Sequence, residues 1–283
     1  MIPRSQQGGT AIFARVLTWG WTLIVLIPLV YLVSISLSAS SARDQFVLWI
    51  FPKNPTLANY PAAFELLASL DQPLPRVFGN SLLVTITAVA MATLLATLAA
   101  YAIVFFRFPG RKLLFTLLCV GLVVPTSVMI IPEFLAVKSL GLRGTPALIA
   151  AYTAFGISLP TLLLASFFAA IPKSVLEAAR LDGASAWRVL WSIVVPLSRP
   201  VLATVSLLLF ITFWSEFPLA STLASDASQS TIPVALSRMS SRQGLPYPIV
   251  ASVMVLASIP LLAIMAVGQR QLVTGLVQGA ERG

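Results

Sequence analysis

Histidine is absent from this chain of 283 residues, and Cys119 is its only cysteine. Without histidine the chain cannot build a Ser-His-Asp triad, an HExxH metal site or a histidine general base. A single cysteine excludes a scaffold held together by internal disulfides. We therefore expect neither catalytic residues nor a metal site on this chain.

Charged residues are also scarce, at 10% of the chain, while hydrophobic residues make up 58% and the mean hydropathy is +0.94. A soluble domain is about 45–50% apolar and about 25% charged, so this composition excludes one, and it excludes a disordered chain too. The 18 Lys and Arg outnumber the 9 Asp and Glu. These cations stand in short runs between apolar stretches rather than on one solvated face with aromatics, so nucleic acid is not an expected partner.

Six apolar stretches are long enough to cross a bilayer as helices, which takes about 20 residues each. Helices satisfy their own backbone hydrogen bonds in lipid, so the sequence predicts an all-α, polytopic membrane protein with six transmembrane helices. The short alternating segments of a membrane barrel are not visible. We expect one transmembrane domain over residues 1–283, with spans at about 17–37, 80–106, 113–135, 146–171, 200–219 and 247–269.

The first apolar stretch follows Arg4 and Arg15 and precedes a run of small residues at 38–42, which is also the pattern of a secretory signal peptide. A signal peptide has an apolar region of only about 7–15 residues. The stretch at 17–37 is longer, so we expect an uncleaved membrane anchor. Six spans place both termini on one side, and the positive-inside rule then favours cytoplasmic termini, since most Lys and Arg fall on the inner segments.

The longest inner segment, residues 173–199, carries the strongest local signals. Ser174 precedes Glu177 by three residues, the spacing of a capping box, so a short helix is expected to start at Ser174. Asp182-Gly183 predicts its end, and an amphipathic stretch follows from Ser185. We expect this helix to lie across the cytoplasmic face. From spacing alone, Glu177 is either a plain helix cap or a functional residue.

The same segment resembles a known motif. Glu177-Ala178-Ala179-x-x-Asp182-Gly183-Ala184, followed by Pro196-Leu197 and Pro200, is similar to the EAA loop of ABC-transporter permeases, and its Asp-Gly-Ala variant resembles the carbohydrate importers of the maltose-permease type. Further stretches resemble that family, with Ser215 in place of its usual Asn and Glu281-Arg282 in place of its common Val-Lys. They are Asn80-Ser81-Leu82, Arg107-Phe108-Pro109-Gly110-Arg111, Trp214-Ser215-Glu216-Phe217 and Gly279-Ala280-Glu281-Arg282-Gly283.

The resemblance implies a permease subunit that moves a sugar or sugar derivative across a bacterial or archaeal cytoplasmic membrane. It also implies four kinds of partner besides membrane lipid: a second homologous permease, two ATPase subunits, an extracytoplasmic substrate-binding protein, and the ATP and magnesium that the ATPases carry. The chain itself is not an expected enzyme, because it has no G-x-x-x-x-G-K-[ST] nucleotide loop. The residues that the resemblance assigns to ATPase coupling are Glu177, Ala178, Ala179, Asp182 and Gly183.

The substrate path is less sharply marked. Trp214 and Glu216 are candidates for it, because an aromatic ring and a carboxylate suit a sugar; an aromatic belt residue beside a helix-end carboxylate is the competing interpretation. Glu133 is interpreted as an interfacial or loop residue. The serine-rich segment 218–248 either contacts the substrate-binding protein or is a solvated linker.

Other functions remain as alternatives. One is an ABC permease for a glycerol-phosphate-type or polyol substrate. Two others belong to different classes: an ion-coupled secondary transporter, which would need ionisable residues near the bilayer midplane, and a membrane-integral transferase, which would need acidic or histidine clusters. Neither feature is visible in the sequence.

Overall fold

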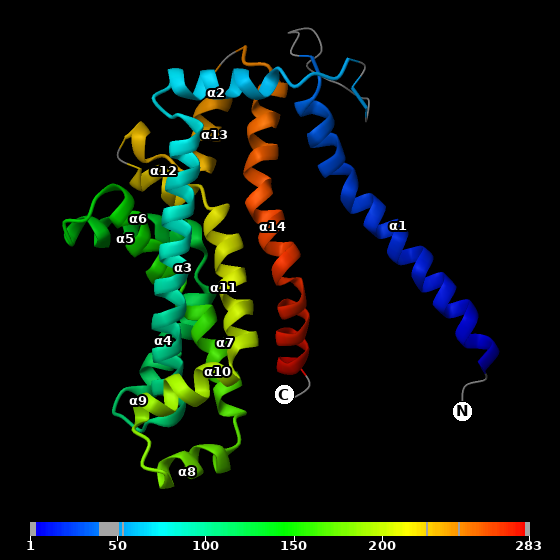
Figure 1. Cartoon of the computed structure of the whole chain (residues 1–283). Coiled ribbons are helices and arrows are strands. Elements are labelled where there is room, and N and C mark those ends of the chain that lie inside the picture. The colour runs from blue at the N-terminus through cyan, green and yellow to red at the C-terminus, as the bar shows by residue number, and fades with distance from the viewer. Residues whose placement is uncertain (1–3, 40–50, 53, 225, 243, 281–283) are drawn as a thin grey trace. The chain divides into compact units, whose positions relative to one another are not determined.

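The computed structural model describes the chain except residues 1–3, 40–50, 53, 225, 243 and 281–283, and it leaves the side chains of residues 4–12 and 270–280 outside the description as well. The described part is helical and contains no strand, which confirms the all-α class (Figure 1). Of the family-like stretch at 279–283, Glu281, Arg282 and Gly283 lie outside the described residues.

The chain divides into two compact units. Residues 1–69 and 236–258 form unit 1, and residues 70–235 and 259–283 form unit 2. Unit 1 contains α1 (Arg4–Ser36) and α2 (Asn59–Ser69). Its organising residue is the buried Asn59, whose side-chain amide donates to the carbonyl oxygens of Ser36 at 2.8 Å and Ser38 at 2.7 Å. The backbone carbonyl oxygen of Asn59 accepts from the Ser252 hydroxyl at 3.2 Å.

Unit 2 carries the remaining helices, of which α13 and α14 are divided between the two units. They are α3 (Leu74–Phe105), α4 (Arg111–Val123), α5 (Thr126–Ser139), α6 (Gly144–Phe155), α7 (Ser158–Ala169), α8 (Lys173–Leu181), α9 (Ala186–Val189), a π-helical turn (Leu190–Val194), α10 (Val195–Leu197), α11 (Arg199–Trp214), α12 (Pro218–Leu223), a 3-10 turn (Ala227–Gln229), α13 (Ile232–Ser240) and α14 (Tyr247–Ala280).

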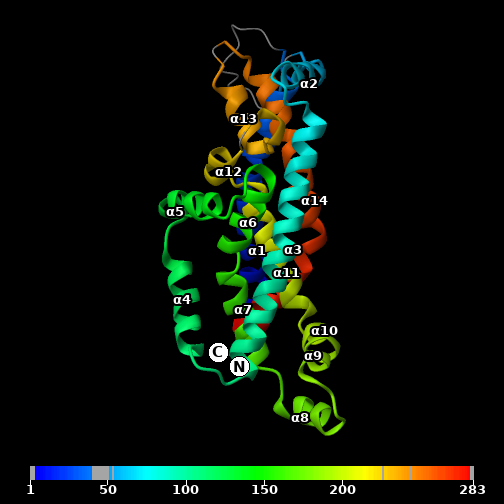
Figure 2. The ribbon, with the colours of Figure 1, turned by 90° about the vertical axis from the view of Figure 1, so that its left-hand side faces the viewer.

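The central element of unit 2 is α3, which packs against α6, α7 and α11 (Figures 1 and 2). A stripe of alanines one turn apart lies on its packed face and is fully buried: Ala88, Ala92, Ala96 and Ala100. Small side chains let helix backbones approach closely in a membrane protein. Gly156 serves the same purpose, since an added Cβ would lie 2.5 Å from the ring of Phe213. The small residues of the second and fourth spans therefore pack helices together.

Three segments are long single helices able to cross a membrane: Phe13–Ser36, Leu74–Phe105 and Tyr247–Gln269. Three further spans are bent pairs, which brings the total to six when each pair counts as one span. The pairs are α4 with α5 at 119°, α6 with α7 at 43°, and the segment Ala186–Leu197 with α11 at 78°.

The segment 113–135, expected as one span, is broken into α4 and α5 in the structure. Between α4 and α5 the chain is extended, with ψ of 123° at Val124. Pro125 explains the break, because proline lacks an N–H and disfavours helical backbone in the residue before it. As a result α5 lies across the bundle instead of along it (Figure 2).

Two hydrophobic cores occupy opposite halves of unit 2. The α5–α6–α12 core includes Val84, Val137, Tyr152, Phe213 and Leu219. The α7–α8–α9 core includes Tyr101, Phe168, Leu176, Val189 and Leu190. Each core supports one of the two sites described below.

The interpretation of residues 218–248 as a solvated linker was wrong for the part that lies in unit 2. That part contains α12, and Leu219, Leu223 and Val234 in it are buried. It is also bonded to the start of α3: the Asn80 amide donates to the carbonyl oxygen of Ser228 at 2.8 Å, and the Ser81 hydroxyl accepts from the N–H of Ile232 at 2.8 Å. This segment is thus a structured cap on the helices.

Candidate functional site

The short helix expected in segment 173–199 is present as α8, but it starts one residue early. Pro172 is its N-cap, and no side chain caps it, so the expected capping box of Ser174 and Glu177 does not form. Because helical geometry already begins at Lys173, Ser174 lies inside the first turn instead of at the cap. The plain-cap interpretation of Glu177 therefore has no support in the structure.

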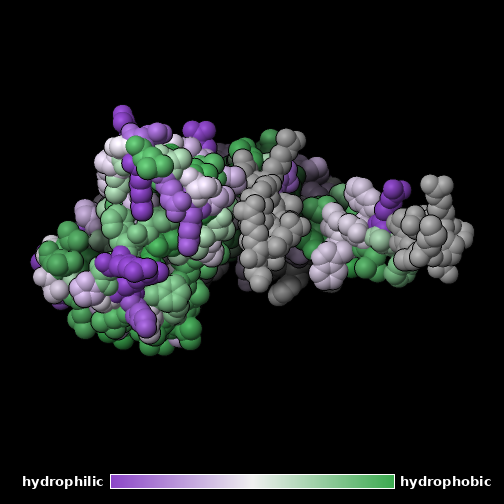
Figure 3. Space-filling model, turned by 90° about the horizontal axis from the view of Figure 1, so that it is seen from below, coloured by the Kyte–Doolittle hydropathy of each residue, from purple (hydrophilic) through white to green (hydrophobic). Residues whose placement is uncertain are grey.

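One face of α8 is buried and the other is open. Leu176 and Ala179 are buried in the α7–α8–α9 core, whereas Glu177, Ala178 and Asp182 are exposed. Leu181, which the sequence did not single out, is 90% exposed at the end of the helix. The end of unit 2 that carries α8 shows hydrophilic side chains gathered among hydrophobic ones (Figure 3).

The end of α8 is a Schellman motif, as the Asp182-Gly183 signal predicts. The N–H of Gly183 donates to the carbonyl oxygen of Arg180 at 3.0 Å, and the N–H of Ala184 donates to that of Ala179 at 2.9 Å. Gly183 has a φ of +74°, a left-handed conformation that side chains disfavour. An added Cβ there would meet nothing within 4 Å, so backbone strain is the only cost of a substitution.

The chain after the turn is also fixed. Ser185 caps α9, its hydroxyl accepting from the N–H of Arg188 at 3.3 Å. The hydroxyl of Tyr101, near the end of α3, donates to the carbonyl oxygen of Ala186 at 2.8 Å. The loop is therefore joined to the central helix by a side chain that sequence reasoning missed, because the two residues are far apart in the chain.

The second site is a cavity of about 300 Å³ in the opposite half of unit 2. It lies among α5, α6, α11 and α12 and is lined by two carboxylates, four hydroxyl side chains and a phenyl ring, with no lysine or arginine. Its polar and aromatic lining residues are Thr126, Ser127, Glu133, Tyr152, Phe155, Thr212 and Glu216. This mixture of hydroxyl acceptors and a ring face suits a polyhydroxylated ligand.

The two carboxylates of the cavity are held very differently. Glu216 accepts three hydrogen bonds: from the Tyr152 hydroxyl at 2.7 Å, from the N–H of Leu219 at 2.7 Å and from the N–H of Ala220 at 2.9 Å. It therefore caps α12 and joins that helix to α6. Glu133, on α5, is half-buried and has no hydrogen bond or ion pair to any residue that the structure describes. Its carboxylate is free to meet a ligand.

Trp214 does not line this cavity. Its side chain is 5% exposed and stacks on Phe210, with ring centroids 5.5 Å apart, while Phe78 meets it edge-on at 6.3 Å. The structure thus separates Trp214 from Glu216, although they are near neighbours in the chain, and it places Glu133 beside Glu216 instead. Sequence reasoning missed this pairing because the bend at Val124–Pro125 creates it.

Comparisons with known proteins agree with this architecture. Residues 77–277 match the family described as binding-protein-dependent transport system inner membrane component. The chain is 31% identical to the sulfoquinovosyl glycerol transport system permease protein SmoH of Agrobacterium fabrum, over 91% of this chain and 89% of that one. It is 32% identical to the trehalose transport system permease protein SugB of Mycobacterium tuberculosis, over 93% and 95%.

A solved structure shows the same fold. It belongs to a bacterial ABC transporter involved in the import of the acidic polysaccharide alginate, and one of its chains superposes with a TM-score of 0.77 and 24% identity, covering 95% of this chain and 98% of that one. The family match spans most of the chain and includes both sites. This chain therefore belongs to the binding-protein-dependent transport system inner membrane components, the multi-pass permease subunits of ABC importers.

Proposed function

We propose that this permease imports a neutral sugar or sugar derivative, with α8 as its coupling helix and both termini in the cytoplasm. The observation that carries the proposal is α8: a short helix with one face buried in the core, a rigid glycine turn at its end, and Glu177, Asp182 and Leu181 left exposed. Such a helix can pass a partner's movement to the helix bundle, since its buried residues share one core with residues of α3, α7 and α9.

The partners follow from the same helix and from the family. A separate ATPase subunit docks on α8, and it carries the ATP and magnesium. A second ATPase and a second, homologous permease complete the membrane assembly. An extracytoplasmic binding protein delivers substrate at the opposite end. In support, one solved structure of similar fold is an alginate transporter in complex with a periplasmic protein bound to an alginate pentasaccharide.

The cavity favours a neutral sugar over a phosphate ester. Its lining presents two carboxylates and four hydroxyl groups, which can accept and donate hydrogen bonds to sugar hydroxyls, and it has no cation to pair with a phosphate. Relatives include a trehalose permease and a diacetylchitobiose uptake permease, but also permeases for sulfoquinovosyl glycerol and sn-glycerol-3-phosphate. The cavity lining supports a neutral sugar as the proposed substrate class.

Uptake into proteoliposomes tests the proposal. The chain is purified with its ATPases, second permease and binding protein, and uptake of radiolabelled trehalose, diacetylchitobiose and sn-glycerol-3-phosphate is measured with ATP inside. We expect uptake of a neutral sugar, and we expect Glu133→Gln to raise its KM by about tenfold, the effect of losing one hydrogen bond to a charged group. Uptake of the phosphate ester in preference to both sugars would contradict the proposed substrate class.

A further inference from the structure

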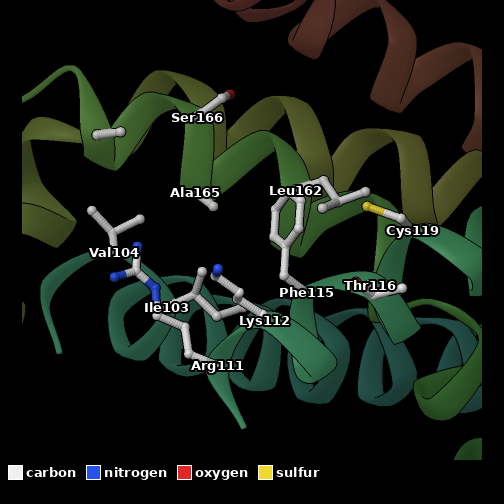
Figure 4. Close-up of a pocket in the computed structure, with 11 residues that line it drawn as sticks. Ile103, Val104, Arg111, Lys112, Phe115, Thr116, Cys119, Leu162, Ala165 and Ser166 are labelled. Carbon is white, nitrogen blue, oxygen red and sulfur yellow. The ribbon is translucent and has the colours of Figure 1, made fainter. Parts of the chain in front are cut away.

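A second, larger hollow lies at the α8 end of unit 2, and the proposed transport function does not use it. It is a groove of about 930 Å³ between α3, α4 and α7 (Figure 4). Its walls are mostly apolar, with Ile103 and Val104 on α3, Phe115 on α4, and Leu162 and Ala165 on α7. A groove with such walls is suited to a hydrocarbon chain.

The groove changes character along α4. Arg111 and Lys112 lie at one end of it, in the first turn of the helix, and Phe115 and Cys119 follow (Figure 4). From Arg111 to Cys119 the helix rises about 12 Å, at about 1.5 Å per residue. One end of the groove is therefore cationic, and the rest is mostly apolar apart from the hydroxyls of Thr116 and Ser166. Its length corresponds to the part of an acyl chain next to the headgroup.

The two cations have no acidic partner among the residues that the structure describes. Neither Arg111 nor Lys112 forms an ion pair with a residue that the structure describes, and both are exposed. No Asp or Glu occurs in the sequence between Asp71 and Glu133, so α3, α4 and the turn between them hold no counter-charge. Arg107 in that turn adds a third cation. The cationic end of the groove could therefore pair with an anionic group that comes from outside the chain.

We propose that the groove binds an anionic glycerophospholipid, with its phosphate at Arg111 and Lys112 and an acyl chain along Phe115 and Cys119. Basic pockets between transmembrane helices on the cytoplasmic side are sites of this kind. The proposal relies on the proposed function in one respect only, the placement of the α8 end on the cytoplasmic side. The lipid bridges α4 to α3 and α7, and so supports the helices that lead to the coupling loop.

The chain's single cysteine provides the probe. In the assembled transporter, built with cysteine-free partner subunits, a bimane fluorophore is attached to Cys119. The complex is placed in nanodiscs of phosphatidylcholine that contain either dibromo-phosphatidylglycerol or dibromo-phosphatidylcholine. Bromine quenches bimane on contact. We expect the phosphatidylglycerol to quench at a mole fraction lower by roughly twenty-fivefold, since each of the two cations near an anionic lipid contributes about fivefold.

Variants separate charge from folding. The double variant Arg111→Gln with Lys112→Gln is expected to abolish the preference for phosphatidylglycerol over phosphatidylcholine. The double variant Arg111→Lys with Lys112→Arg keeps both positive charges and is expected to retain this preference. The matched control is Lys138→Gln with Arg143→Gln, which removes two exposed cations near the end of α5 and should leave the preference intact. Added sn-glycerol-3-phosphate should not relieve the quenching, because a free phosphate ester has no acyl chain for the groove.

The remaining outcomes overturn the proposal. Equal quenching by both lipids would show that the cations select nothing. Absence of quenching by either lipid would show that protein, such as the second permease, fills the groove. Uptake is measured with the same purified complex reconstituted into proteoliposomes. It reports separately on the proposed transport function, so failure of the lipid proposal is distinguishable from failure of the transport proposal.

Discussion

The two ends of unit 2 use charge in opposite ways. Around α8 the charged side chains of Glu177, Arg180 and Asp182 are exposed, and the backbone is fixed by a Schellman turn. At the cavity, Glu216 is fixed by three hydrogen bonds and only Glu133 is free. In the proposed function, one end presents the α8 loop to an ATPase, and the other presents the Glu133 carboxylate to the substrate.

The largest expected effect comes from backbone strain at the turn after α8, compared with the same strain at the turn after α5. Gly183→Val places a branched side chain at φ +74°, at a cost of roughly 1–3 kcal/mol, so the turn opens and α8 loses its alignment. We expect substrate uptake and substrate-stimulated ATP hydrolysis to fall by about tenfold or more. Gly141→Val is the matched control, since Gly141 also has a φ of +74° with nothing within 4 Å, but follows α5. Equal losses in both variants would contradict the role of the α8 turn.

The next effect distinguishes the two carboxylates. Glu216→Ala leaves the Tyr152 hydroxyl and two N–H groups of α12 without their acceptor. Each such group costs about 1–3 kcal/mol, so we expect a clear fall in the thermal unfolding midpoint in detergent. Glu133→Ala should leave that midpoint unchanged and reduce uptake instead. If Glu133→Ala destabilised the protein as much as Glu216→Ala, the distinction between a fixed and a free carboxylate would be wrong.

Helix packing beside the cavity is sensitive to one methyl group. Gly156→Ala brings a Cβ to 2.5 Å from the Phe213 ring, which must shift at a cost of about 1–3 kcal/mol. Gly79→Ala is the control, because nothing lies within 4 Å of its Cβ position on α3, and there the substitution stabilises the helix by roughly 0.5–1 kcal/mol. Thermal unfolding midpoints that move in opposite directions would bear this out; a stabilising Gly156→Ala would contradict it.

The smallest effect concerns the link between α3 and the coupling loop. Tyr101→Phe keeps the ring contacts with Phe105 and Phe106 and removes only the hydrogen bond to Ala186. One such bond contributes about 0.5–1.5 kcal/mol. We expect basal ATP hydrolysis to persist while its stimulation by substrate weakens several-fold. Unchanged stimulation would show that the bond does not transmit movement.

The sequence was most informative where a signal is local. Gly183 ends α8 and Ser185 caps α9 through hydrogen bonds between residues only three to five positions apart. The end of α8 and the start of α9 could therefore be predicted from spacing. Six apolar stretches likewise predicted six spans, because hydrophobic length is a property of one segment. The predicted start of α8 was one residue too late, because Pro172 is the N-cap and Ser174 already lies inside the first turn.

The cavity could not be predicted, because four separate segments build it. Its position depends on the 119° bend between α4 and α5, which turns Glu133 from a residue at a span's end into a neighbour of Glu216. Trp214 was grouped with Glu216 because they are close in sequence, but the end of α11 buries the ring while the carboxylate reaches α12. Long-range geometry of this kind has no signature in composition or spacing.

Photo-crosslinking at Leu181 tests the central claim most directly. A benzoylphenylalanine replaces this leucine, which is 90% exposed at the end of α8, and a second variant carries it at Leu140, which is 72% exposed after α5. In the complete transporter, the account predicts an adduct with the ATPase subunit from position 181 and none with the ATPase from position 140. An ATPase adduct from position 140, or its absence from position 181 in an actively transporting complex, would contradict it.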